Sequence, residues 1–124
     1  MGSSPGTSPQ EFFAGHPLGL AVCERLRAIL GSLGDVDVRV TKSQVAFRRR
    51  RSFAYVWLPG RYLDHPGAEV VLSIALRRRI DSPRWKEVVE PRPGWWMHHL
   101  EVLDVEDIDA EVVAWLQEAA DYAG

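Results

Sequence analysis

Cysteine is scarce and long apolar runs are absent, and each absence excludes a class of protein. Cys23 is the only cysteine in the 124 residues, so no disulfide can form within the chain and a disulfide-stabilised secreted scaffold is excluded. Its place within a helical pattern predicts a buried, unreactive thiol. No apolar stretch approaches the roughly 20 residues that span a bilayer, and the N-terminus lacks the regions of a signal peptide. We therefore expect a cytoplasmic protein with no membrane partner.

The motifs of common catalytic and metal sites are lacking as well. The sequence contains no Gly-x-Ser-x-Gly elbow, no Gly-rich loop after a strand, no His-Glu-x-x-His pattern, no cysteine cluster and no Glu-x-Lys pair. These absences predict that the protein has no metal site and no cofactor. They identify no catalytic residue, and they favour a protein that is not an enzyme.

Opposite charges are separated along the chain, although the formal net charge is only −2. Residues 39–92 contain eleven Arg and two Lys against five acidic residues, which gives this segment a net charge of +8. Residues 93–124 contain eight acidic residues and no Lys or Arg. The two segments either neutralise each other in the fold or form two separate surfaces, and the sequence is compatible with both.

Local signals predict helices near both ends of the chain. Ser8 and Glu11 have the spacing of a capping box, and Pro17 is placed to begin a second, longer helix with an apolar stripe. Asp109 is placed to cap a C-terminal helix. Both termini of the fold are therefore expected to be helical.

Between these helices, apolar residues recur at every second position, which is typical of strands. The short links between the strands predict an antiparallel meander of about six strands, flanked by the N-terminal and C-terminal helices on one face. We expect a single α+β domain over residues 8–124, preceded by a disordered tail over residues 1–7. The expected strands are residues 36–41, 44–48, 53–58, 69–76, 85–89 and 96–103.

Four consecutive arginines, residues 48–51, form the most conspicuous local feature, an arginine-rich hairpin turn. Two or three of these guanidiniums could converge on a phosphate, joined by Lys42 and Ser43 from the preceding turn. The alternative is a solvated turn, with or without pairing to the acidic C-terminal segment. A second run, residues 77–79, strengthens the anion-binding interpretation only if it lies at the same edge of the sheet as the first.

Two adjacent histidines in the last strand, His98 and His99, suggest a metal or acid–base site. Adjacent strand residues point to opposite faces, so these two side chains do not bind one metal without a bulge. His98 shares its face with Leu100 and Val102, which favours a hydrogen-bonded histidine near the core over a general base.

Several segments resemble a bacterial domain-of-unknown-function family, number fifty-six fifty-five in its series. They are Thr41–Arg49, Phe53–Ala54, Trp96–Leu100 and the closing helix over Asp109–Tyr122. The resemblance covers about residues 18–122 and implies a small α+β domain that sometimes accompanies nuclease-like domains. It also implies a ligand-binding surface, because the family's Lys-Ser pattern, basic turn and late histidine fall on Lys42, Ser43, Arg48, Arg49 and His98.

The leading hypothesis from the sequence is a non-enzymatic module that binds an anionic partner, either a nucleic acid or a phosphorylated small molecule. Lys42 and the arginines of residues 48–51 would carry that binding. One alternative is a protein-interaction or homodimerisation module that uses Trp95, Trp96 and an exposed sheet edge. The other is a small hydrolase or transferase that uses His98.

Overall fold

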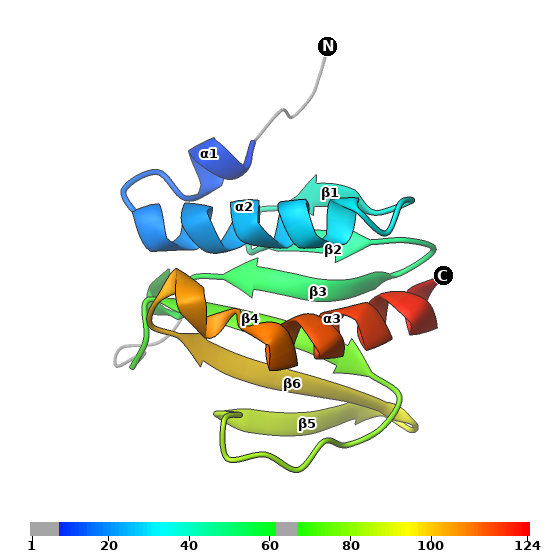
Figure 1. Cartoon of the computed structure of the whole chain (residues 1–124). Coiled ribbons are helices and arrows are strands. Elements are labelled where there is room, and N and C mark those ends of the chain that lie inside the picture. The colour runs from blue at the N-terminus through cyan, green and yellow to red at the C-terminus, as the bar shows by residue number, and fades with distance from the viewer. Residues whose placement is uncertain (1–7, 62–66) are drawn as a thin grey trace.

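The computed structural model describes residues 8–61 and 67–124. The tail predicted over residues 1–7 lies outside the described residues. Six antiparallel strands form one sheet in the order β1-β2-β3-β4-β6-β5, and helices α2 and α3 lie across one face of it (Figure 1). The elements are α1 (Pro9–Phe12), α2 (Pro17–Gly31), β1 (Asp37–Val40), β2 (Val45–Arg48), β3 (Ser52–Trp57), β4 (Val70–Leu76), β5 (Glu87–Arg92), β6 (Trp95–Val102) and α3 (Ala110–Ala123), with short 3-10 turns at Pro59–Arg61 and Val105–Asp107.

The structure confirms the predicted α+β class, the antiparallel sheet and the flanking helices. The strand order differs from a simple meander in its last hairpin, because β6 pairs with β4 and β5 lies at the edge. Burial explains this order. Every residue of β4 is buried, so β4 needs a long partner on each side, and β6 pairs with all seven of its residues. β5 is mostly exposed, which suits an edge strand.

The predicted helix caps are present. Ser8 accepts a hydrogen bond from the backbone N–H of Glu11, and the Glu11 carboxylate accepts from the backbone N–H of Ser8, which completes a capping box. α2 begins at Pro17. Asp109 caps α3 by accepting from the N–H of Val112.

A continuous apolar core lies between the two long helices and the sheet. α2 contributes Val22, Cys23, Leu26 and Leu30, all fully buried. The predicted buried thiol is therefore confirmed, and burial raises the pKa of Cys23 to about 11, so it stays protonated. Among the described residues, no helix is both long enough and apolar enough to cross a membrane.

None of the described helices covers the opposite face of the sheet (Figure 1). The register places Tyr55 beside Ser73, and Ser73 beside His99, on neighbouring strands. Because side chains alternate along a strand, Trp95 and Met97 of β6 lie on this same face as His99. We call this helix-free surface the open face.

Candidate functional site

The structure does not bring the predicted ligand-binding residues together. Lys42 and Ser43 lie in the turn between β1 and β2, whereas Arg48 ends β2 and Arg49 lies in the turn between β2 and β3. Successive turns of an antiparallel sheet lie at opposite ends of the strand they share. Lys42 and Ser43 are therefore at the far end of β2 from the arginine turn, and the expected joint anion site does not form.

Arg49 connects the hairpin to the end of α3. Its guanidinium donates hydrogen bonds to the backbone carbonyls of Ala120 and Leu33, and lies 4.0 Å from the Asp121 carboxylate. Only 18% of this side chain is exposed. Arg49 is therefore not a free cation at the hairpin tip. Arg48 lies opposite Asp37 of β1 in the strand register.

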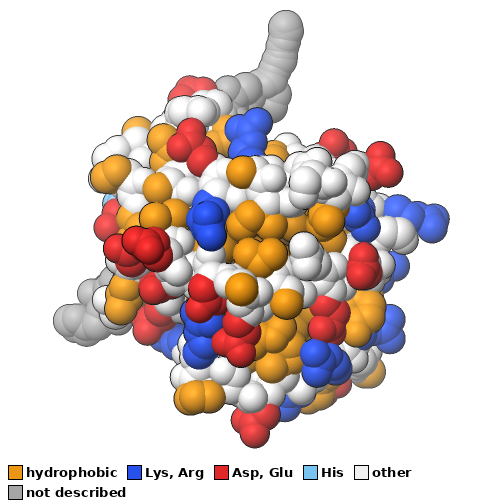
Figure 2. All heavy atoms as spheres, viewed as in Figure 1, with side chains coloured by type: hydrophobic (Ala, Val, Ile, Leu, Met, Phe, Trp, Pro, Cys, Tyr) orange, Lys and Arg blue, Asp and Glu red, His pale blue; other side chains and the backbone are white. Residues whose placement is uncertain are grey.

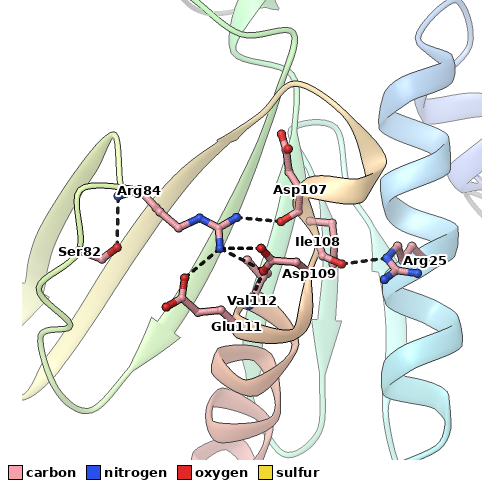
Figure 3. A network of polar contacts seen from close by, with 8 residues as sticks. All are labelled: Arg25, Ser82, Arg84, Asp107, Ile108, Asp109, Glu111 and Val112. Carbon is pink, nitrogen blue, oxygen red and sulfur yellow. Dashed lines mark hydrogen bonds and ion pairs between the residues drawn. The ribbon is translucent and has the colours of Figure 1, made fainter.

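Two other arginines pair with acidic residues of the C-terminal segment. Arg84, between β4 and β5, contacts the carboxylates of Asp109 and Glu111 at 3.0 and 2.9 Å (Figure 3). Arg78 contacts Glu118 at 2.9 Å. On the helix-bearing face, acidic and basic side chains are accordingly mixed around apolar patches (Figure 2). On this side of the molecule the opposite charges of the two segments compensate each other.

His98 is a core residue. It has no exposed surface, its Nε2 accepts a hydrogen bond from the Ile80 N–H at 3.0 Å, and its Nδ1 lies 3.1 Å from the Trp96 carbonyl oxygen. These partners assign the proton to Nδ1 and a neutral ring. Burial lowers the pKa of His98, which favours the same state. The interpretation of His98 as a hydrogen-bonded histidine near the core is thus correct, and no ligand can reach it.

Three other arginines gather at one end of the sheet, around Trp95. The Cζ atoms of Arg77, Arg51 and Arg92 lie 4.6, 4.9 and 5.4 Å from the centroid of the Trp95 ring. We call these four residues the Trp95 cluster. They come from the β2–β3 turn, the end of β4 and the β5–β6 hairpin, which share the right-hand end of the sheet in Figure 1.

Sequence reasoning missed this cluster, although a signal for it was present. The two arginine runs, residues 48–51 and 77–79, do lie at the same end of the sheet, which was the stated condition for an anionic partner. Each run is divided, however. Arg51 and Arg77 join the Trp95 cluster, whereas Arg49 and Arg78 pair with α3.

Two shallow pockets lie side by side on the open face. The first, of about 290 Å³, is lined by Arg51, Arg92 and Trp95 together with Tyr55 and Met97. The second pocket has a volume of about 370 Å³ and shares Tyr55 and Met97 with the first. It is lined by Gln44, Tyr55, Trp57, Ser73, Met97 and His99. The Trp95 cluster thus opens directly onto a pocket with aromatic walls.

Hydrogen bonds to the buried Ser73 hydroxyl hold two side chains that line the second pocket. The Ser73 hydroxyl, whose residue is 3% exposed, accepts from the Trp57 indole N–H at 2.9 Å and lies 2.7 Å from His99 Nδ1. Burial lowers the pKa of His99, so its ring is neutral at neutral pH. Within residues 8–61 and 67–124, the other ring nitrogen, Nε2, forms no hydrogen bond to protein. In the same part of the chain, no three His, Cys, Asp or Glu side chains form a metal-binding group.

The fold and this surface define a small α+β domain with one helix-covered face and one open face that carries arginines and aromatic rings. The chain belongs to the domain-of-unknown-function family DUF5655, whose family model matches residues 10–122. The match begins at residue 10 and not near residue 18, so it corrects the expected extent of the resemblance and includes most of α1. Comparison with curated proteins and with solved structures found no match.

Proposed function

We propose that this protein is a binding module for an anionic ligand, and that the Trp95 cluster holds the phosphate or other anionic group of that ligand. The proposal keeps the hypothesis of an anionic partner but moves the site away from Lys42, Ser43, Arg48, Arg49 and His98. The single observation that carries it is the convergence of three guanidiniums on one indole ring, with no carboxylate partner among residues 8–61 and 67–124.

Electrostatics explains why this convergence favours an anion. Among the residues that the structure describes, Arg51, Arg77 and Arg92 form no ion pair, whereas Arg49, Arg78 and Arg84 all do. Positive charges gathered around one ring repel one another. A bound phosphate would remove that repulsion and accept several charge-assisted hydrogen bonds.

The cluster is held in place by its surroundings. The Nε of Arg77 donates to the Gly94 carbonyl at 2.8 Å, and the Gly94 N–H donates to the Glu90 carboxylate at 3.1 Å. The Glu90 carboxylate, which lies near the cluster, therefore accepts its hydrogen bond from the backbone. Gly94 has φ +80°, a conformation that suits glycine, and the turn it allows places Trp95 next to Arg92.

Isothermal titration calorimetry with inorganic tripolyphosphate tests this function. We expect the Arg51→Ser/Arg77→Ser/Arg92→Ser variant to lose at least tenfold in affinity, and the affinity of the wild-type protein to fall as salt increases. A matched control, Arg27→Ser/Arg39→Ser/Lys42→Ser, removes the same charge elsewhere and should retain most of the affinity. Equal losses in the two variants, or no binding by the wild-type protein, would contradict the proposal.

A homodimer through the sheet edge is a second candidate, supported by the exposure of β5. Val89 is one of the few large apolar side chains exposed there. The same edge carries Glu87, Glu90 and Arg92, and charged side chains of this kind disfavour edge-to-edge pairing. Light scattering combined with size exclusion tests this candidate, because a monomer at high protein concentration excludes it.

A further inference from the structure

We infer that the anionic ligand is a single-stranded nucleic acid, whose backbone phosphate binds at the Trp95 cluster while an adjoining base enters the pocket formed by Tyr55, Met97 and His99. This inference rests on the proposed function and adds the class of ligand. The observation that carries it is the direct continuity of a cationic pocket with an aromatic one on the same open face.

The two pockets form one groove. They share Tyr55 and Met97 as lining residues. Trp95, Met97 and His99 are alternate residues of β6, so Trp95 and His99 are separated by about 13 Å at ~3.3 Å per residue. A single inorganic phosphate does not cover that span, whereas a ligand with a phosphate at one end and a further group beyond it does.

The second pocket has the chemistry of a base-binding site. Tyr55 and His99 supply flat rings and Met97 a polarizable thioether, which together can accept the face of a planar heterocycle. Burial raises the pKa of Tyr55 and lowers the pKa of His99, so both rings are neutral. This pocket therefore favours an uncharged planar group over a second phosphate.

Polar groups at the pocket can contact the edge of a base. Gln44, whose amide has one donor and one acceptor group, is among the lining residues. His99 is oriented by Ser73, and its Nε2 has no protein partner among the described residues. Hydrogen bonds to a base edge combined with stacking on its face are the usual way in which unpaired bases are recognised.

The shape of the site favours a single strand over a duplex. The groove lies on a half-buried sheet surface and is lined by aromatic side chains, which can stack only on the exposed face of a base. The bases of a duplex are stacked on one another and do not expose these faces. An acidic or phosphorylated peptide would satisfy the arginines, but it would fill the aromatic pocket only if it carried an aromatic residue next to its anionic group.

Fluorescence anisotropy on the full chain distinguishes the contribution of the base to the binding affinity from that of the phosphate. The probes are a labelled oligouridylate, an abasic oligonucleotide of the same length and charge, and a duplex of the same length. We expect the wild-type protein to bind the oligouridylate about tenfold more tightly than the abasic strand, with the duplex weaker than the oligouridylate. This comparison needs no variant, so a folding defect cannot affect it.

A variant in the pocket then locates the base. His99→Leu should reduce the affinity for oligouridylate toward that for the abasic strand and leave tripolyphosphate binding unchanged, because His99 lines the second pocket and not the first. Trp96→Leu, at the end of β6 outside the pocket, is the control and should bind as the wild-type protein does. Equal binding of oligouridylate and abasic strand would overturn this inference and leave the proposed function standing. Failure of all probes, tripolyphosphate included, would overturn both.

Discussion

Arg77 and Trp95 form a stacked pair at the end of the sheet, with the Arg77 Cζ 4.6 Å from the centroid of the indole ring. A hydrogen bond also holds Arg77 in this position, because its Nε donates to the carbonyl of Gly94, the residue directly before Trp95. Arg51 of the β2–β3 turn and Arg92 at the end of β5 approach the same ring. The indole therefore acts as a platform that holds three cations in one place.

Trp95→Leu should weaken tripolyphosphate binding by about fivefold while all three arginines remain. Loss of the ring removes the cation–π contacts, each of about 0.5–1 kcal/mol at an exposed site, so the guanidiniums are less well ordered. Calorimetry measures the affinity. Trp96→Leu is the matched control and should change it by less than about twofold, since the cation–π partner of Trp96 is Arg79, which is outside the Trp95 cluster. Unchanged affinity in Trp95→Leu would show that the platform does not organise the site.

His98 should make the fold less stable in mild acid. Because burial lowers the pKa of His98 in the folded protein, the unfolded chain takes up the proton first as the pH falls. The free energy of unfolding is therefore fully maintained above about pH 6.5, the ordinary histidine pKa. It decreases as the pH falls from there toward the lowered pKa. Urea unfolding at a series of pH values measures this decrease.

NMR separates His98 from the other histidines in that experiment. Its ring signals should not titrate near pH 6.5 in the folded protein, and its Nδ1 should carry the proton. His98→Leu removes the acceptor for the buried N–H of Ile80 and should cost about 1–3 kcal/mol. A titration of His98 with an ordinary pKa would contradict its assigned state.

Asp109 should contribute to stability mainly as a helix cap. Asp109→Ala removes the acceptor for the Val112 N–H and should lower the free energy of unfolding by about 1 kcal/mol. Asp109→Asn keeps the cap but loses the charge that faces Arg84, so it should cost less. Hydrogen bonds from Arg84 lower the pKa of Asp109, so its contribution is present above about pH 4 and is lost as the pH falls through the lowered value. Equal stability of the Ala and Asn variants would contradict the capping role.

Two glycines of α2 should respond in opposite ways to alanine. A Cβ atom on Gly19 would overlap the ring of Phe13, a core residue, so Gly19→Ala should destabilise the protein by about 1–3 kcal/mol. A Cβ on Gly31 meets no atom within 4 Å, so Gly31→Ala should be neutral or stabilise by up to about 1 kcal/mol. Chemical denaturation measures both. A neutral Gly19→Ala would show that the Phe13 ring does not pack against Gly19 of α2.

The helices and most strands could be predicted because their signals are local. Ser8, Pro17 and Asp109 mark helix starts with their own side chains or rings, and alternation of apolar residues marks strands. The order of β5 and β6 could not be read in this way, because it depends on which strand pairs with β4.

The site was predicted less well because it is non-local. Trp95 and its arginines come from three connections that meet only when the sheet forms, and neighbouring arginines of one run have different partners. The error at Lys42 was avoidable, since antiparallel pairing alone separates that turn from the hairpin of residues 48–51.

The central claim is that the Trp95 cluster binds the anion. The most direct measurement is an NMR titration of ¹⁵N-labelled protein with tripolyphosphate, in which the five tryptophan indole N–H signals are followed individually. We predict saturable shifts of the Trp95 indole and of the Arg51, Arg77 and Arg92 Nε–H signals, with the Lys42 and Ser43 amides unmoved. Shifts at the Lys42 turn with none at Trp95, or no shift at saturating ligand, would contradict the claim.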